Sequence, residues 1–374
     1  MKTLLRLLIC GALLAPMVHS GAGQVNEKKV VVPRIEVCFV LDTTGSMSGL
    51  IEGAKQKIWS IANELVGAKP TPDLRLGLVA YRDKRDEYVL KSHDLTNDID
   101  AVYANLKTFT AGGGGDMPES VNEALHEAVT KMSWSTNRSV LKIIFLVGDA
   151  PPHMDYHNAP KYPEICQDAM KLDLIINTIQ CGGIRDTTPI WKEIAKLSEG
   201  SYAAIAQEGG MVAIATPMDD KLAELNRKVG ATLVAYGSER MRREVISKQT
   251  AAEAAPASVA ADRLSFNSSV GRTVQGKGEL LDALASGELD VAAIKKDQLP
   301  SEWQGLNDAE LKARIASRQK ERAEIQAEIV KLSQARDNYL ATERRKLAGS
   351  EDSFDSQVAG TIRSQAARKG INYK

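Results

Sequence analysis

The chain has 374 residues, which is enough for two domains because one domain typically holds about 100 to 200 residues. Lys plus Arg and Asp plus Glu both number 48, so the formal net charge is zero. This balance excludes a global electrostatic attraction to nucleic acid or to anionic lipid. With 43% hydrophobic and 26% charged residues, the composition is that of an ordinary globular protein.

Residues 1–20 have the pattern of a secretory signal peptide. They start with basic residues, continue as an apolar stretch over 7–18, and end in V-H-S, which suits a small-residue cleavage site. No later segment approaches the ~18 apolar residues of a membrane-spanning helix. We therefore expect cleavage near Gly21 or Gly23 and a periplasmic or secreted mature protein without a transmembrane segment.

The first predicted strand is followed by a loop of oxygen ligands. Residues 37–41 read V-C-F-V-L, and such an unbroken apolar run is typical of a strand buried on both faces of a parallel sheet. Asp42, Thr44 and Ser46 follow at alternate positions. Open α/β sheets bind their ligands at the carboxyl ends of strands, and a carboxylate with two hydroxyls suits Mg2+, Mn2+ or Ca2+. The sequence therefore predicts a divalent-cation site at this loop.

Strand and helix patterns alternate along the chain up to about residue 230. Helical periodicity covers 49–66, 98–106, 121–132, 164–172, 190–197 and 218–229, and further strands are predicted at 74–81, 87–91, 140–147, 174–180 and 202–206. The strand at 87–91 has charged flanks and suits an antiparallel edge. The alternation predicts an α/β fold, a doubly wound, mostly parallel six-stranded sheet with helices on both faces.

Two more loops carry acidic residues beside predicted elements. Residues 112–119 read G-G-G-G-D-M-P-E, with Asp116 as the acid after the glycines. Residues 146–152 read L-V-G-D-A-P-P, and Asp149 follows the apolar end of a predicted strand. Their order and spacing are compatible with a single site shared with the first loop.

The three loops resemble the metal-ion-dependent adhesion site (MIDAS) of von Willebrand factor type A (VWA) domains, here of the bacterial secreted or periplasmic type. In that family the loops read D-x-S-x-S, then G-G-T-D-x-P-E or G-G-G-D-x-P-E, then T-D-G or T-D-A-P-P. The resemblance covers about residues 31–230. It implies one bound divalent cation, Mg2+ first with Mn2+ or Ca2+ as alternatives. The implied ligands are Asp42, Thr44, Ser46 and Asp149, with Asp116 as a weaker fifth.

One position departs from the family pattern. Gly115 stands where members with a complete site have threonine, and a metal with fewer protein oxygens must keep more water. We therefore expect a weaker site. Asp116 could compensate as a direct or water-mediated ligand, and it also suits the N-cap of the following helix; both interpretations stay open.

Catalytic interpretations find less support in the residues. An aspartic-protease loop needs D-T-G and a second copy of it for the paired acids, and residues 42–45 read D-T-T-G. A nucleophilic Ser46 needs a histidine base, yet the chain has five histidines, one of them in the leader, and no triad can be nominated. Residues 153–157 read H-M-D-Y-H. A second metal site there is conceivable, but we interpret them as a polar loop at the rim, with His153 shaping the loop.

Three cysteines remain in the mature chain. Cys38 lies in the first predicted strand and is interpreted as an inert core thiol. Cys166 and Cys181 could form a disulfide in an oxidising compartment. Against this, a strand rises about 3.3 Å per residue and a helix about 1.5 Å, so the two thiols can lie at heights that a bridge cannot span. Both outcomes stay open.

The sequence changes character after residue 230. Residues 250–262 are rich in alanine with one proline and are predicted as a linker. Residues 263–349 are predicted as mainly helical, with a long amphipathic helix at 308–347, and residues 350–374 as a flexible tail. Apolar residues in this helix follow a partial heptad pattern that arginines interrupt. Such a stripe can pack on its own domain or form a coiled coil with a second chain.

We expect a binding protein rather than an enzyme. The resemblance implies that the cation accepts an acidic side chain from a partner protein. The alternative is a structural or assembly factor of an envelope complex in which the metal site is secondary, and a metal-dependent hydrolase is the third hypothesis. Nucleic acid is not an expected partner.

Overall fold

The computed structural model describes residues 32–158, 160–346 and 353–373, so the predicted signal peptide lies outside the described residues. Six strands form one sheet: β1 (Arg34–Asp42), β2 (Asp73–Tyr81), β3 (Leu90–Thr96), β4 (Leu141–Gly148), β5 (Ile175–Cys181) and β6 (Tyr202–Ile205). None of the helices in these ranges is both long enough and apolar enough to cross a bilayer.

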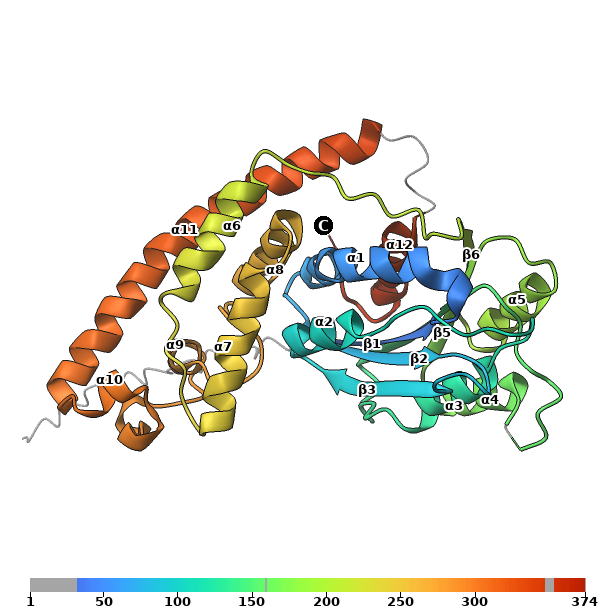
Figure 1. Cartoon of the computed structure of the whole chain (residues 1–374), viewed down its shortest axis with the longest axis horizontal. Helices are drawn as coiled ribbons and strands as arrows, with labels where there is room; N and C mark the ends of the chain where they lie inside the picture. The colour runs from blue at the N-terminus through green and yellow to red at the C-terminus, as the bar shows by residue number, and fades with distance from the viewer. Residues whose placement is uncertain (1–31, 159, 347–352, 374) are drawn as a thin grey trace, which may run out of the picture. The chain divides into compact units, whose positions relative to one another are not determined.

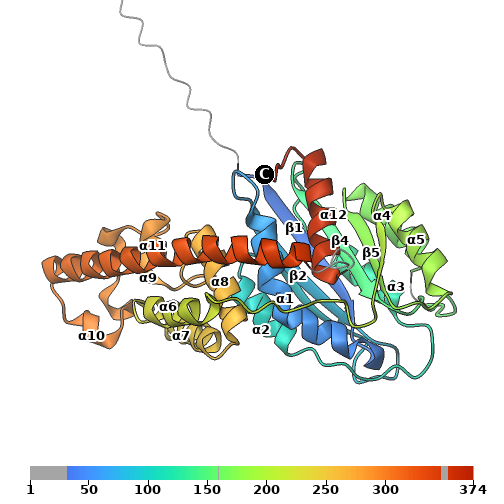
Figure 2. The same ribbon diagram turned by 90° about the horizontal axis from the view of Figure 1, so that it is seen from above.

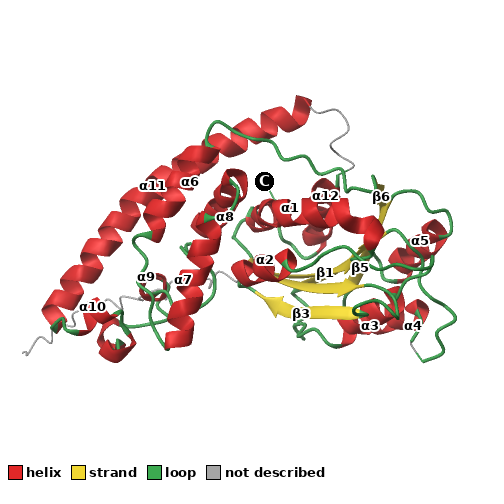
Figure 3. Ribbon diagram, viewed as in Figure 1, coloured by secondary structure: helices red, strands yellow, loops and turns green. Residues whose placement is uncertain are grey.

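The strand order is β3-β2-β1-β4-β5-β6. Figure 1 labels β3, β2 and β1 at one side of the sheet, and Figure 3 shows the strands in yellow among the helices in red. β3 runs antiparallel to β2, and the other neighbouring strands are parallel. The predicted fold class is therefore confirmed. The edge strand begins at Leu90 and continues to Thr96, later than the predicted 87–91, because Leu95 turns into the core.

Helices alternate with the strands and then form a second, helical region. The helices are α1 (Ser48–Val66), α2 (Ile99–Lys107), α3 (Val121–Thr130), α4 (Tyr162–Lys171), α5 (Thr187–Leu197), α6 (Asp219–Gly230), α7 (Glu239–Glu253), α8 (Ala257–Ser269), α9 (Leu280–Ala285), α10 (Ser301–Gln304), α11 (Asp308–Lys346) and α12 (Phe354–Arg368). Three short 3-10 turns are η1 (Gly45–Met47), η2 (Val291–Ala293) and η3 (Lys296–Gln298).

Both faces of the sheet are covered. Buried side chains of α1, α2, α8 and α12 pack on one face, and those of α3, α4 and α5 pack on the other; Figure 2 gives a view from above. Alternate residues of each strand point to opposite faces: Phe39 stacks on Phe145 on the first face, whereas Val40 belongs to the second. This two-sided burial explains the unbroken apolar runs.

The structure corrects the predicted linker and tail. Within the predicted linker, residues 250–253 end α7 and residues 257–262 begin α8, with only three residues between the helices and Pro256 as the N-cap of α8. Alanine is the best helix former, so this stretch continues the helices instead of separating domains. In the predicted tail, residues 354–368 form α12, whose Val358 and Ile362 are fully buried.

The apolar stripe of α11 packs on its own chain. Leu311 and Ile315 enter a cluster with residues of α9 and α10, and Ile329 packs on α6 and α8. Two of the arginines that interrupt the stripe also lie on the packed face: Arg322 and Arg336 are buried and form ion pairs. The interpretation as a helix packed within its own chain therefore fits this geometry, and the stripe is filled without a second chain.

The three cysteines in the described part of the chain, Cys38, Cys166 and Cys181, are free and buried, so the bridge between Cys166 and Cys181 is not formed. Cys181 points to the sheet face covered by α1, whereas Cys166 of α4 lies on the opposite face. A disulfide needs Cα atoms within about 7 Å, and here the sheet itself lies between the two thiols. The interpretation of Cys38 as a core thiol agrees with its complete burial.

Candidate functional site

The first loop of the site turns sharply after β1. Asp42 ends the strand, and its Oδ1 accepts hydrogen bonds from the backbone N–H of Thr44 (2.8 Å) and from the Thr44 hydroxyl (2.6 Å). The Thr44 hydroxyl lies 3.5 Å from the Ser46 hydroxyl. Thr44 is buried and Ser46 is exposed. The three oxygens at alternate positions therefore lie close together, with Ser46 at the solvent side.

Asp149 reaches the same edge of the sheet from the neighbouring strand. In the register of β1 and β4, Leu41 lies opposite Val147, so the two strands deliver Asp42 and Asp149 side by side. A Cβ built on Gly148 would lie 3.1 Å from Asp42 Oδ2. Glycine at this position is what allows the second strand to pass so close to the carboxylate.

The environment of the Asp42 carboxylate favours the binding of a cation. Its Oδ2 is buried and has no hydrogen-bond partner among the described residues. Burial raises the pKa of Asp42 to about 7 in spite of the hydrogen bonds from Thr44, and the Asp149 carboxylate adds to the rise. A buried carboxylate that lacks a partner is costly, and a cation would supply that partner.

Glu119 belongs to this group, although the sequence analysis assigned it no role. It is 3% exposed, and its Oε2 also lacks a partner among the described residues. Burial raises its pKa to about 9, with further contributions from the carboxylates of Asp42, Asp83, Asp86 and Asp149. The D-M-P-E motif places Glu119 next to the ligand loop, but the motif does not show that this side chain turns inward.

Gln207 is a second residue that sequence reasoning missed. Its amide Nε2 donates to Asp149 Oδ2 at 2.8 Å and to the Ser46 carbonyl at 3.2 Å. It follows the short strand β6, and no local pattern marks it. Gln207 thereby ties the first and third loops together and occupies one oxygen of Asp149.

The glycine loop packs against the first loop through its backbone. The N–H of Gly45 donates to the Gly113 carbonyl (3.3 Å), and the N–H of Gly112 donates to the Thr43 carbonyl (3.1 Å). Gly114 has φ +81°, and a Cβ there would lie 3.3 Å from Thr44 Cβ and 3.4 Å from Glu119 Oε1. Around Gly115, in contrast, a Cβ would meet nothing within 4 Å.

Asp116 takes a different place from the predicted one. Its side chain is 65% exposed, and Oδ2 lies 3.9 Å from His153 Nε2. It shares a group of metal-ligand type with Asp83 and His153. It is not the helix N-cap either, because α3 begins after Ser120. The glycine loop turns the Asp116 side chain outward, and the inward acid of the loop is Glu119.

The buried oxygens of this site fit a hard divalent cation. Two acidic oxygens, Asp42 Oδ2 and Glu119 Oε2, and the Tyr81 hydroxyl are buried without partners among the described residues. Carboxylates and hydroxyls are ligands that Mg2+, Mn2+ and Ca2+ accept. Asp42, Thr44, Ser46 and Asp149 are therefore the residues that could hold such an ion, with Glu119 beside them.

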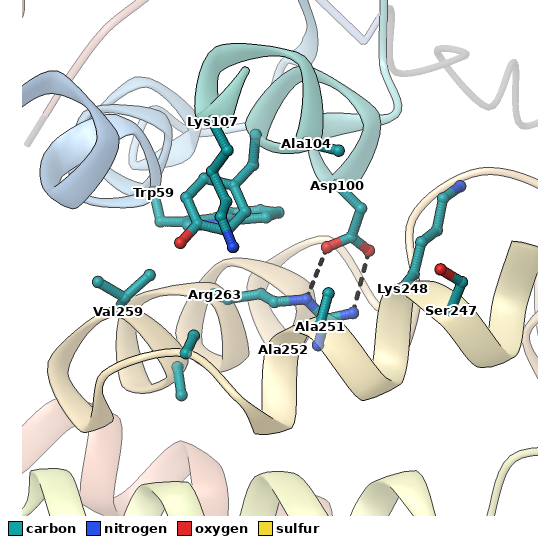
Figure 4. Close-up of a pocket in the computed structure, with 13 residues that line it drawn as sticks. Trp59, Asp100, Ala104, Lys107, Ser247, Lys248, Ala251, Ala252, Val259 and Arg263 are labelled. Atoms are coloured by element: carbon teal, nitrogen blue, oxygen red, sulfur yellow. Dashed lines mark hydrogen bonds and ion pairs between the residues drawn. The ribbon is translucent and has the colours of Figure 1, made fainter. Parts of the chain in front are cut away.

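A cavity of about 220 Å3 lies elsewhere, between α1, α2, α7 and α8. Figure 4 shows Asp100 facing the Arg263 guanidinium across it, with bonds of 2.6 and 3.0 Å. The backbone N–H of Gln275 also donates to Asp100 (3.1 Å). This ion pair links α8 to α2. Because its two buried charges neutralise each other, the cavity does not need a charged ligand.

Comparisons with known proteins identify the family of the domain that carries the site. The model of the von Willebrand factor A domain family matches residues 36–217. Alpha-protein kinase vwkA of Dictyostelium discoideum is 28% identical over 151 residues, 39% of this chain and 23% of that protein. Von Willebrand factor A domain-containing protein 7 of Mus musculus is 33% identical over 122 residues, 33% of this chain and 12% of that protein.

This chain therefore spans less than a quarter of the length of these two relatives. Among solved structures, the crystal structure of the SpRpn10 VWA domain aligns with 47% of this chain and 89% of that chain, at 15% identity and a TM-score of 0.36. The family match covers the strands β1 to β6 and all three loops of the site. The chain is thus a VWA-domain protein, whose von Willebrand factor A domain lies at residues 36–217.

Proposed function

We propose that this chain is a secreted or periplasmic protein that binds a partner protein through a divalent cation, Mg2+ in the first place. VWA domains commonly bind proteins. The observation that carries the proposal is the buried Asp42 carboxylate, whose Oδ2 has no partner among the described residues, beneath the hydroxyls of Thr44 and Ser46. The predicted signal peptide at residues 1–20 motivates the proposed location.

The proposed ligands contribute two kinds of oxygen to the site. Asp42 and Asp149 supply negative charge from two adjacent strands, while Thr44 and Ser46 supply neutral oxygens. Held mainly by neutral oxygens and water, the ion would keep an open coordination position for a Glu or Asp of the partner. Ser46 is exposed, so the chain leaves that side of the loop accessible.

The surface near the loops supports docking of a protein. Met117 and Met154 are 55% and 46% exposed. Met117 lies in the second loop, and Met154 lies in the rim loop that follows the third. Methionine adapts its shape and is common on binding surfaces. Exposed apolar groups beside a charged centre suit a contact area for a partner that presents an acidic residue.

We propose binding rather than catalysis. The Thr44 hydroxyl donates to Asp42, and within the described residues neither it nor the Ser46 hydroxyl is hydrogen-bonded to a histidine. A nucleophilic mechanism needs such a base. The two hydroxyls are better placed as ligands.

Two measurements test the proposal. Calorimetry on metal-stripped mature protein should show one Mg2+ site that Asp42→Ala abolishes. Immobilised protein should retain a partner from envelope extract in Mg2+ and release it in EDTA, and the Asp42→Ala protein should not retain it. Ser48→Ala, which removes an exposed hydroxyl just beyond the loop, is the matched control and should behave as the wild type.

Two results would contradict the proposal. If Asp42→Ala bound Mg2+ as well as the wild type does, the proposed Mg2+ site would be wrong. Retention of the same partner in EDTA and by Asp42→Ala would separate binding from the metal and would favour the alternative, an assembly factor in which the metal site is secondary.

A further inference from the structure

A second group of ligand-type side chains lies next to the first site. Asp83, Asp116 and His153 each offer one ligand atom, and these atoms all lie within 4.8 Å of one another. Asp83 follows β2, Asp116 belongs to the glycine loop, and His153 follows β4. The three residues therefore come from three separate loops, and the tertiary fold brings them together.

His153 is the observation that points to a ligand. The residue is 5% exposed, and its Nε2 is buried without a hydrogen-bond partner among the described residues. Its other nitrogen, Nδ1, lies 2.8 Å from Asp155 Oδ1. A carboxylate at this place favours the tautomer with hydrogen on Nδ1, which leaves the lone pair on Nε2. That lone pair faces Asp83 and Asp116.

The second ligand, Asp83, is held in place by hydrogen bonds, and the third, Asp116, lies toward solvent. Asp83 is 4% exposed, and it accepts hydrogen bonds from the hydroxyls of Ser120 (3.0 Å) and Tyr156 (2.8 and 3.0 Å). The ring of Tyr156 stacks on His153 at 4.0 Å between centroids. Asp116 is mostly exposed and gives the group an opening to solvent. Ligands fixed by hydrogen bonds are what metal sites require.

The distances suit a shared ion better than direct pairing. His153 Nε2 is 3.5 Å from Asp83 Oδ1 and 3.9 Å from Asp116 Oδ2. A charge-assisted N–H···O bond would be about 2.7 to 2.9 Å. Ligand bonds of about 2.0 to 2.2 Å in a tetrahedral site place neighbouring donor atoms roughly 3.3 to 3.6 Å apart. The three ligand atoms lie within 4.8 Å of one another, and the exposed Asp116 side chain is the one that can move toward the other two.

We propose that Asp83, Asp116 and His153 form a second cation site that takes a first-row transition ion of the Zn2+ or Mn2+ type. Imidazole suits Zn2+ and its neighbours in the series, whereas carboxylates are shared with Mn2+. The imidazole nitrogen distinguishes this site from the all-oxygen first site. Three protein ligands leave one or more positions for water or for a group of a partner.

The site is tested with Zn2+ on the full mature chain. The first site is saturated with excess Mg2+, and Zn2+ is then titrated by calorimetry; one Zn2+ should bind per chain. Co2+ is a second probe, because its visible absorption reports nitrogen and oxygen ligation. Asp116→Ala and His153→Ala should each weaken Zn2+ binding by more than about tenfold, and Asp116→Ala carries little risk of misfolding because this side chain is exposed.

The controls separate this site from surface binding and from the first site. His157→Ala removes an exposed histidine of the same loop and should bind Zn2+ as the wild type does. Asp42→Ala should retain the Zn2+ site while it loses Mg2+. Asp155→Ala acts only through His153 and should cost about 10- to 100-fold in Zn2+ affinity without a change in stoichiometry.

Unchanged Zn2+ binding in both Asp116→Ala and His153→Ala would overturn the proposal, as would an equal loss in His157→Ala. A wild-type protein that gives no binding heat with either Zn2+ or Mn2+ would also overturn it.

Discussion

Asp42 ends β1 with one carboxylate oxygen held by Thr44 and the other buried without a partner among the described residues. Such an arrangement opposes stability in the metal-free protein, since a desolvated charge without a partner is unfavourable. The Asp149 carboxylate adds negative charge nearby. Stability and cation binding are therefore expected to respond in opposite directions to a change at this residue.

We predict that Asp42→Asn stabilises the metal-free protein by about 1 to 3 kcal/mol, the usual cost of an unsatisfied buried group. The amide keeps the acceptor for Thr44 and removes the buried charge. Mg2+ at 100 times its dissociation constant should stabilise the wild type by about 2.7 kcal/mol and should not stabilise the variant. Thermal unfolding with EDTA and with Mg2+ measures both effects. A variant that Mg2+ stabilises as much as the wild type would contradict this expectation.

We predict that Gly115→Thr leaves Mg2+ affinity within about twofold of the wild type. The family threonine suggests a gain, but in this loop a Cβ at Gly115 meets nothing within 4 Å, so the hydroxyl would not approach Thr44 or Glu119. The same open space means that the substitution should cost less than about 0.5 kcal/mol, as surface changes usually do. Calorimetry and thermal unfolding test both statements. Markedly tighter binding would show that the loop rearranges around the ion.

The ligand set could be predicted only in part. Asp42, Thr44, Ser46 and Asp149 directly follow buried strands, and adjacent parallel strands bring such residues together. Glu119, Gln207 and His153 depend on how loops distant in sequence fold over one another. Sequence periodicity does not show how these loops fold over one another. The inward turn of Glu119 and the outward turn of Asp116 therefore could not be predicted from the motif.

At the scale of elements, α11 shows why a charged stripe can still be buried. Arg336 reaches Asp219 of α6 (2.7 Å) and Asp262 of α8 (2.5 Å), while Arg322 reaches Glu279 (2.9 Å) and Asp282 (3.0 Å) near α9. The partial heptad predicted a helix with one packed face. The partners of its arginines could not be predicted, because they come from three other helices.

We predict that Arg336→Ala destabilises the protein by about 3 to 5 kcal/mol, because it leaves two acids buried without their partner. Arg318→Ala on the same helix is the matched control. Arg318 forms only a partly exposed pair with Glu321 at 2.8 Å, and its loss should cost about 0 to 1 kcal/mol. Urea unfolding followed by circular dichroism measures the difference. Equal effects of the two substitutions would mean that the buried pair adds nothing to stability.

We predict that Ile362→Ala costs about 2 to 5 kcal/mol, the range for a large core residue reduced to alanine. Ile362 of α12 is fully buried against the sheet, whereas the nearby Ser364 is exposed. Ser364→Ala should therefore change stability by less than about 0.5 kcal/mol. The two variants can be compared by thermal unfolding in the presence of EDTA. A small effect of Ile362→Ala would show that α12 is only loosely attached.

At the scale of the whole molecule, segments that follow the VWA match complete its core. Phe354 of α12 lies 6.1 Å from Phe39 of β1 between ring centroids, and Phe266 of α8 packs on Trp59 of α1 at 5.5 Å. Gln365 and Asn177 also exchange hydrogen bonds between α12 and β5 (2.7 and 3.2 Å). Sequence reasoning drew a boundary near residue 230 because the alternation of strands and helices is complete there, but alternation does not reveal which later helix covers the sheet.

We therefore predict that a chain of residues 31–230 does not fold stably alone, although the sequence led us to expect an independent domain. Without α8 and α12, the face that holds Phe39 and Trp59 would be exposed to water, and a large exposed apolar patch favours association. The separate piece should show weak near-ultraviolet circular dichroism and a mass above that of a monomer in light scattering, whereas the mature full chain should give a cooperative unfolding transition. A monomeric piece with a cooperative transition and normal Mg2+ binding would show that α8 and α12 only cover a core that is already complete.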